Sequence, residues 1–136
     1  MASILKVDAL QGITAAGDIT VTSEGGAATQ SLQQGLAKVW VNFNGTGTIA
    51  ARDSLNLSSL TDNGTGQYTV NFSNATQDVN FAAISSCNYR TTTQTDENAR
   101  TTSAVDISCA IGASGSSVVG HTDKDIVQVA ALGDLA

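Results

Sequence analysis

The residues best able to do chemistry are few and scattered along the chain. His121 is the only histidine, and it stands two residues before Asp123 in a stretch rich in Gly, Ser and Thr. Catalysis needs an acid, a base or a nucleophile that neighbouring groups hold in place, whereas this short His-Asp spacing is typical of an exposed loop. The sequence also contains no G-x-S-x-G elbow and no phosphate-binding loop. We therefore predict that the protein is not an enzyme and has no catalytic residue.

Two acidic clusters, Asp96-Glu97 and Asp123-Lys124-Asp125, could attract a divalent cation, because hard cations prefer several oxygen ligands. Neither cluster matches an EF-hand loop, and solvated surface charge explains both. One histidine and two cysteines without C-x-x-C spacing cannot complete a zinc site. We predict no metal site and no cofactor.

The two cysteines, Cys87 and Cys109, each stand in phase with apolar residues of a predicted strand, so both side chains should point inward. We favour two small buried thiols. A disulfide is the alternative if the two strands bring the Cα atoms to within about 4.4–6.8 Å of each other. Synthesis in a reducing cytoplasm disfavours that bond.

The composition favours strands joined by tight turns. Charged residues make up 13% of the chain, aromatic residues 4%, and proline is absent. Thr, Ser, Asn and Gly supply most of the polar surface. Thr fits a pleated sheet because of its branched Cβ, and Gly and Asn adopt the positive φ angles of tight hairpins. These features predict an all-β fold with antiparallel strands.

The net charge of −6 excludes several classes of partner. A nucleic-acid binder needs clustered Lys and Arg to replace phosphate counterions, and this chain has six such residues, all scattered. The same deficit argues against an anionic membrane surface. No apolar run approaches the roughly 20 residues of a membrane-spanning helix, and the opening residues do not resemble a signal peptide. We expect no nucleic acid and no membrane among the partners, and synthesis in a cytoplasm without secretion.

From residue 38 onward, apolar and polar residues alternate with a period of two, which indicates strands. This part of the chain also holds every aromatic residue, and aromatic side chains bring the largest buried areas. We predict a β-sandwich-like domain over residues 38–136. The tetrad Asn-Gly-Thr-Gly occurs at 44–47 and again at 63–66, and we interpret both copies as turns.

Two loops are candidates for recognition, because loops carry recognition more often than strands do. A Thr-rich stretch at 88–102, which we interpret as an exposed loop or the tip of a long hairpin, has Asp96, Glu97 and Asn98 at its centre. A Gly- and Ser-rich stretch at 112–120 leads to His121.

Residues 1–37 form a different region, with strands expected near 3–7 and 18–22 and a short helix or turn over 29–37. Thr29 or Ser31 would cap the helix. These elements are too short to be stable alone, so we expect the region to dock and oligomerise.

Three residues are candidates for oligomer or packing contacts. Leu32 and Leu36 stand one turn apart in the expected helix. Trp40, the sole tryptophan, is out of phase with the inward-facing Val39 and Val41. We favour a subunit or interdomain contact for Trp40, and a place in the core or a contact with a ligand are the alternatives.

Several segments resemble the tail-fibre-like proteins of marine tailed phages, of cyanophage and pelagiphage type. They are the opening Ser3–Gly12, the run Gly35–Gly47, the runs Asp53–Asn56 and Thr61–Phe72, and the ending Gly133–Ala136. The resemblance implies a homotrimeric, non-catalytic structural protein that is made in the bacterial host cytoplasm and resides in the virion. It implies other virion proteins of the tail or capsid as partners, together with a glycan or protein of the host surface. A capsid decoration or cement protein is one alternative, and a small glycan-active enzyme is an alternative of another class.

Overall fold

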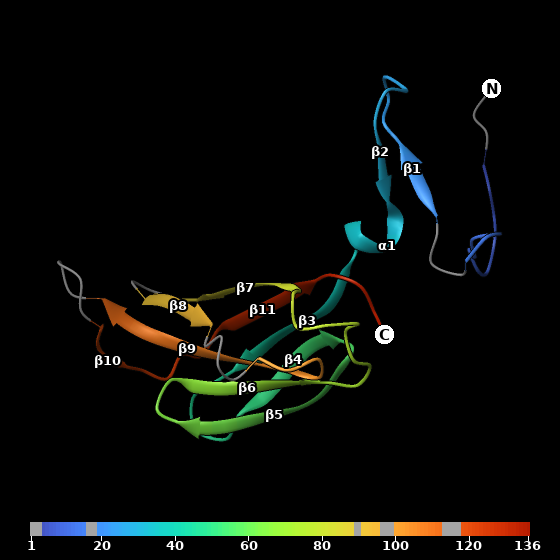
Figure 1. The fold of residues 1–136 in the computed structure, drawn as a ribbon. Coiled ribbons are helices and arrows are strands. Elements are labelled where there is room, and N and C mark those ends of the chain that lie inside the picture. Colours follow the sequence, from blue (N-terminus) through green and yellow to red (C-terminus); the bar gives the residue numbers. More distant parts are fainter. Residues whose placement is uncertain (1–3, 16–18, 89–90, 96–99, 113–117) are drawn as a thin grey trace. The chain divides into compact units, whose positions relative to one another are not determined.

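The computed structural model describes residues 4–15, 19–88, 91–95, 100–112 and 118–136 (Figure 1). The chain divides into two compact units, Met1–Leu36 and Ala37–Ala136. The docking and oligomerising role predicted for residues 1–37 stays a prediction.

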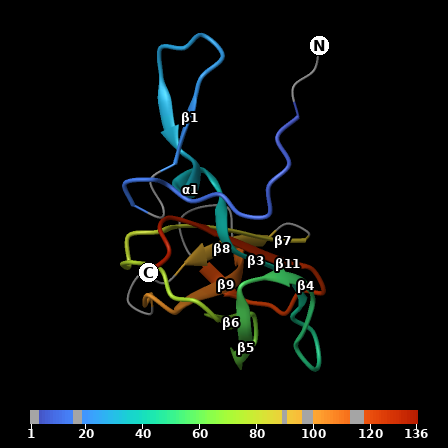
Figure 2. The ribbon, with the colours of Figure 1, turned by 90° about the vertical axis from the view of Figure 1, so that its right-hand side faces the viewer.

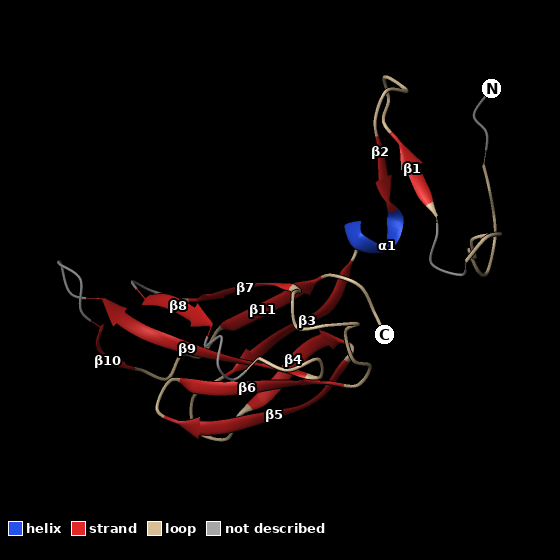
Figure 3. Cartoon of the chain, viewed as in Figure 1, coloured by secondary structure: helices blue, strands red, loops and turns tan. Residues whose placement is uncertain are grey.

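Strands dominate the described residues, and their partners are antiparallel, which confirms the all-β prediction (Figure 3). The elements in chain order are β1 (Thr20–Thr22), β2 (Thr29–Ser31), α1 (Leu32–Gly35), β3 (Ala37–Asn44), β4 (Ala50–Leu55), β5 (Leu57–Gly64), β6 (Gln67–Phe72), β7 (Ala82–Cys87), β8 (Thr91–Thr95), β9 (Ala104–Gly112), β10 (Val118–His121) and β11 (Val127–Leu132).

The second unit contains two sheets. One has the strand order β4-β3-β11-β7, and we call it the four-stranded sheet. The other has the order β10-β9-β6-β5, with β8 paired to the opposite side of β9, and we call it the five-stranded sheet. Within this unit, Figure 2 shows β7 and β11 on one side and β5 and β6 on the other. The two sheets therefore form the layers of a sandwich.

The core lies between the sheets, where alternate residues of four central strands are buried. Its members from β3, β6, β9 and β11, with Phe81, are Val39, Val41, Phe43, Tyr68, Val70, Phe72, Phe81, Val105, Ile107, Cys109, Val127, Val129 and Ala131. Phe43 packs edge-on against Tyr68 across the sheets, with ring centroids 5.2 Å apart. Each fully buried large side chain contributes about 1.5–3 kcal/mol, so burial of these alternate residues is a large stabilising contribution in this unit. Ile111 departs from the pattern, because it is exposed at the end of β9.

A single residue, Asn56, separates β4 of one sheet from β5 of the other. Its φ is 58°, in the left-handed region that Asn tolerates better than most residues. The side chain then binds Asn74 in both directions: Asn56 Nδ2 donates to the Asn74 carbonyl at 3.0 Å, and Asn56 Oδ1 accepts from the Asn74 backbone N–H at 2.7 Å. The amide pair therefore fixes the corner at which the chain changes sheets.

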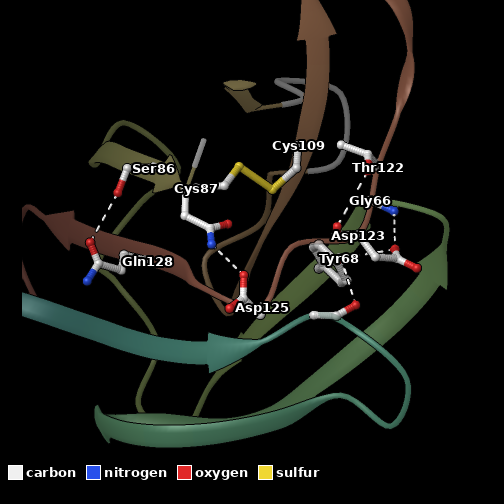
Figure 4. The surroundings of a disulfide bond; sticks show 11 residues. Gly66, Tyr68, Ser86, Cys87, Cys109, Thr122, Asp123, Asp125 and Gln128 are labelled. Atoms are coloured by element: carbon white, nitrogen blue, oxygen red, sulfur yellow. Dashed lines mark hydrogen bonds between the residues drawn. A yellow bond between two sulfur atoms is a disulfide. The ribbon is translucent and has the colours of Figure 1, made fainter. Parts of the chain in front are cut away.

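A disulfide joins Cys87 at the end of β7 to Cys109 in β9, with the Cα atoms 6.5 Å apart (Figure 4). The preferred interpretation of two unpaired thiols is wrong for this structure, and the alternative holds. Because β7 belongs to the four-stranded sheet and β9 to the five-stranded sheet, the bond ties the two layers together.

The first unit contains one small sheet, in which β1 and β2 pair from Thr20↔Ser31 to Thr22↔Thr29. Ser31 accepts a hydrogen bond from the Gln34 backbone N–H at 3.4 Å and caps α1, as predicted for one of two candidates. The strand expected near 3–7 is absent from the described residues 4–7, whose side chains are exposed. A lone extended segment has no neighbour to accept its backbone hydrogen bonds, so its apolar pattern alone does not make a strand.

Candidate functional site

The outer face of the four-stranded sheet carries the strongest candidate site, because cross-strand pairing aligns its side chains in two rows. Residues paired across neighbouring strands point to the same face. The first row is apolar and consists of Leu55, Trp40, Ala130 and Ile84. The second row is polar and consists of Asp53, Asn42, Gln128 and Ser86. We call this surface the Trp40 face.

A groove of about 380 Å³ runs over both rows on β3, β11 and β7. The residues that line it are all uncharged: Trp40, Val41, Asn42, Ile84, Ser85, Ser86, Gln128, Val129 and Ala130. Trp40 is half-buried, whereas Ile84 is 61% exposed. The groove therefore offers an indole and an aliphatic side chain beside neutral hydrogen-bonding groups.

Neighbouring side chains hold the two amides of the groove in fixed orientations. The Ser86 hydroxyl donates to Gln128 Oε1 at 3.2 Å (Figure 4), and Arg52 Nη1 donates to Asn42 Oδ1 at 3.3 Å. Both contacts engage the carbonyl oxygen of an amide, so the NH₂ group is the part left to meet a ligand. Together with the indole N–H of Trp40, the groove is rich in donors.

The outer face of the five-stranded sheet differs, because its polar side chains bind one another. Asn63 Nδ2 donates to Thr69 Oγ1 at 2.8 Å, and Thr69 Oγ1 donates to Asp106 Oδ1 at 2.5 Å. Asn71 Nδ2 likewise donates to Thr61 Oγ1 at 3.2 Å. In this network the described polar side chains already have partners within the sheet.

A second polar cluster joins the two Asn-Gly-Thr-Gly turns, and its centre is the buried Tyr68. The Tyr68 hydroxyl lies 3.0 Å from the Gly45 carbonyl oxygen and 3.1 Å from Asp123 Oδ1 (Figure 4). Asp123 Oδ1 also accepts from the Gly66 backbone N–H at 2.6 Å, and the Gly45 N–H donates to the Lys124 carbonyl at 2.8 Å. The repeated tetrads of the sequence thus meet at one end of the sandwich, held by residues 122–124.

Burial raises the pKa of the Tyr68 hydroxyl well above its usual value, and the negative charge of Asp123 raises it further. The hydroxyl is therefore neutral and acts as a hydrogen-bond donor at every ordinary pH. This cluster holds loops in place, and Asp123 is committed to it rather than to a cation.

The predicted recognition residues fall in different places. Asp96, Glu97 and Asn98 lie outside the described residues. The Thr-rich stretch was expected to be an exposed loop or the tip of a long hairpin, and Thr91–Thr95 forms β8, which pairs antiparallel with the next strand, β9. The Arg100 guanidinium lies 4.9 Å from the centre of the Phe81 ring. Strand pairing with β9 satisfies backbone groups that a loop would leave to water.

His121 was also expected in a loop, but it ends β10 and pairs with Ala110 of β9. Its Nδ1 lies 2.7 Å from Gln67 Nε2. The structure therefore brings it to a neighbouring strand and not into contact with Asp123.

The three predicted packing residues also lie in different places. Leu32 begins α1 and is half-buried, but Leu36 is exposed and has an extended backbone beyond the helix. The two leucines do not share a helix face, because the helix ends at Gly35 after one turn. Trp40 lies outside the core, as its phase in the sequence indicated. A contact with another subunit stays a prediction.

The residues that share the groove with Trp40 were not identified from the sequence. Asn42, Ser86 and Gln128 occupy outward positions of three strands that are far apart in the chain, and only the pairing register brings them together. The one available signal was that each of them stands two residues from an outward-facing apolar residue of its own strand.

Among the residues that the structure describes, no group of three or more His, Cys, Asp or Glu side chains could hold a metal ion. In that same part of the chain, no helix has the length and apolar character needed to cross a bilayer. Comparisons with protein-family models, curated proteins and solved structures found no match for this chain.

Proposed function

We propose that the chain is a non-catalytic structural protein of a tailed-phage virion, of tail-fibre type, which attaches to the particle through its first unit and contacts the host surface through its second. The particle and the family come from the sequence resemblance described above. The observation that carries the proposal is the distribution of apolar side chains in the two units.

The first unit leaves most of its large aliphatic residues exposed. Ile4 and Leu5 are each 78% exposed, and Val7, Leu10 and Ile13 are exposed as well. Closely spaced exposed apolar side chains are typical of surfaces that bind other chains. A segment of this kind supports attachment to the particle and assembly with further copies, for which we propose a homotrimer.

The second unit differs, because most of its large apolar residues form one core and a disulfide joins its two sheets, while Leu55 and Ile84 are exposed on the Trp40 face. A rigid sandwich is a good scaffold for the contact of a virion with a surface. This division of roles supports a fibre-type part better than it supports an enzyme.

Two measurements test this proposal. Gold-labelled antibodies against the chain should mark the tail of purified particles, and sedimentation equilibrium should give the mass of a trimer. Label on the shell with copies in the hundreds would replace the fibre role with that of a capsid decoration protein. A stable, folded monomer in solution would remove the assembly argument.

A further inference from the structure

The groove on the Trp40 face is chemically unlike the rest of this acidic protein. The chain carries a net charge of −6, yet the residues that line the groove are all uncharged. At the edge of the groove, Asn42 pairs with Asp53 and accepts a hydrogen bond from Arg52, so one negative and one positive charge stand side by side there. The lining itself offers no ion pair to offset the hydration that a charged ligand would lose. The ligand chemistry that fits is therefore neutral.

The arrangement of apolar and polar groups narrows the class of ligand further. The apolar row places Trp40 next to Ala130 and then Ile84, and the polar row places Asn42, Gln128 and Ser86 directly alongside. An indole offers a large flat apolar surface and one N–H donor. A pyranose ring has a matching character, because one face consists of C–H groups and its edge carries hydroxyl and ether oxygens.

The donors are also held ready for such oxygens. Ser86 and Arg52 engage the carbonyl oxygens of Gln128 and Asn42, respectively, which leaves the two NH₂ groups to donate. Side chains held in this way lose little conformational freedom when a ligand binds. The groove volume of about 380 Å³ lies within the range of about 300–1,000 Å³ that small-molecule sites occupy.

We propose that this groove binds a neutral saccharide, with the C–H face of one sugar ring on the indole of Trp40 and with sugar oxygens accepting hydrogen bonds from Asn42 and Gln128. The proposal depends on the groove alone and stands whether or not the chain belongs to a virion. The competing occupant of the Trp40 face is a second copy of the chain, whose contact would bury roughly 800 Å² on each partner.

The sole tryptophan gives a direct measurement, because its fluorescence reports on this groove and on nothing else in the protein. The full chain is titrated with maltotriose, lactose, mannotriose and chitotriose, with sialyllactose as the charged comparison. At least one neutral oligosaccharide should shift or quench the emission saturably, with a Kd on the order of 1 mM for one shallow site. The same sugar should protect Trp40 from quenching by acrylamide.

Matched variants locate the site. Trp40→Ala, followed by calorimetry, should weaken binding about tenfold or more, because the stacking surface is lost. Gln128→Glu exchanges the NH₂ donor for a carboxylate of the same shape and should weaken binding by a similar factor. The control Asn71→Asp makes the corresponding exchange on the outer face of the five-stranded sheet, adds the same charge and should leave the Kd unchanged.

Three results would overturn the proposal. The first is the absence of any saccharide effect on Trp40 emission at concentrations up to about 50 mM, well above the expected Kd. The second is binding that Gln128→Glu and Asn71→Asp affect equally. The third is a Trp40 emission that changes with protein concentration in the absence of sugar, together with an oligomer mass that Trp40→Ala lowers. That result would assign the groove to a second copy of the chain. The location of the chain on particles does not enter the saccharide titration, so failure of the saccharide proposal and failure of the virion assignment are separable.

Discussion

Gly66 lies where the β5–β6 turn meets the segment after β10, and it has no room for a side chain. Its φ is +65°, and an added Cβ would lie 2.5 Å from the Thr122 backbone nitrogen. Gly47 is a matched control, because its φ is +62° and an added Cβ would meet nothing within 4 Å. The two positions separate the cost of the backbone conformation from the cost of the close contact.

We predict that Gly47→Ala lowers the free energy of unfolding by about 1 kcal/mol. Gly66→Ala should lower it by about 3 kcal/mol or more, because backbone atoms must also move. Urea denaturation of both variants measures the difference. Equal losses would mean that the contact with Thr122 does not constrain the turn.

Tyr68 makes a pH-dependent contribution to stability. Its pKa is raised by burial and by Asp123 in the folded protein, while the unfolded chain deprotonates near pH 10. The unfolded state therefore loses its proton first, and the free energy of unfolding should fall as the pH rises above about 10, by up to about 1.4 kcal/mol for each pH unit.

Tyr68→Phe should remove this part of the alkaline decline and lower stability at neutral pH by about 1–2 kcal/mol, since Asp123 and Gly45 lose a donor. Chemical denaturation at a series of pH values measures both effects. An unchanged alkaline slope in the variant would show that Tyr68 is not the titrating group.

At the scale of elements, Asn56 controls the passage from β4 to β5. Asn56→Gly keeps access to a positive φ but loses the amide contacts with Asn74, and we expect a loss of about 1–2 kcal/mol. Asn56→Ala loses the contacts and also disfavours the φ of 58°, and it should cost about 1 kcal/mol more than Asn56→Gly. Thermal unfolding of the pair tests this order. A Gly variant as unstable as the Ala variant would show that the amide contacts alone matter.

Strand prediction succeeded where burial on one face forced alternation. β3, β6, β9 and β11 all have buried residues at every second position, and this pattern is visible in a single sequence. It did not locate the strand Thr91–Thr95, because a run of Thr and Gln has no apolar alternation. That strand pairs with the free side of β9, as in the hairpin that was the alternative to a loop for this stretch. The short helix or turn expected over 29–37 covers only Leu32–Gly35 for a related reason, since Thr29–Ser31 pairs with β1.

The candidate site was predictable only in part. Trp40 could be recognised as outward-facing from its phase, but its neighbours depend on which strands pair and in what register. The same limit applied to the disulfide, because the inward phase of Cys87 and Cys109 did not reveal that the two cysteines face each other from opposite sheets.

At the scale of the whole molecule, the disulfide is the only covalent link between the layers that does not follow the chain. It closes a loop with a sequence separation of 22, for which loop entropy predicts a stabilisation of about 3 kcal/mol. We expect dithiothreitol, or the double substitution Cys87→Ser and Cys109→Ser, to lower the Tm by about 10–20 °C without abolishing the fold.

Calorimetry with and without reductant measures this change, and a single Cys87→Ser variant should behave like the double one. If reduction leaves the Tm of the wild-type protein unchanged, the core alone holds the two sheets together.

The position of β3 has a mechanical consequence. Residue 37 begins this strand directly after the first unit, and β3 lies between β4 and β11 rather than at the edge of its sheet. If the protein is tethered through its first unit and pulled along β3, the tension must slide this strand past both neighbours, so that two ladders of hydrogen bonds resist in parallel instead of opening one by one. Single-molecule stretching from residue 37 to the β5–β6 turn should therefore give a higher rupture force than stretching from residue 37 to the C-terminus, which unzips β3 and β11 from the end where Ala37 faces Leu132.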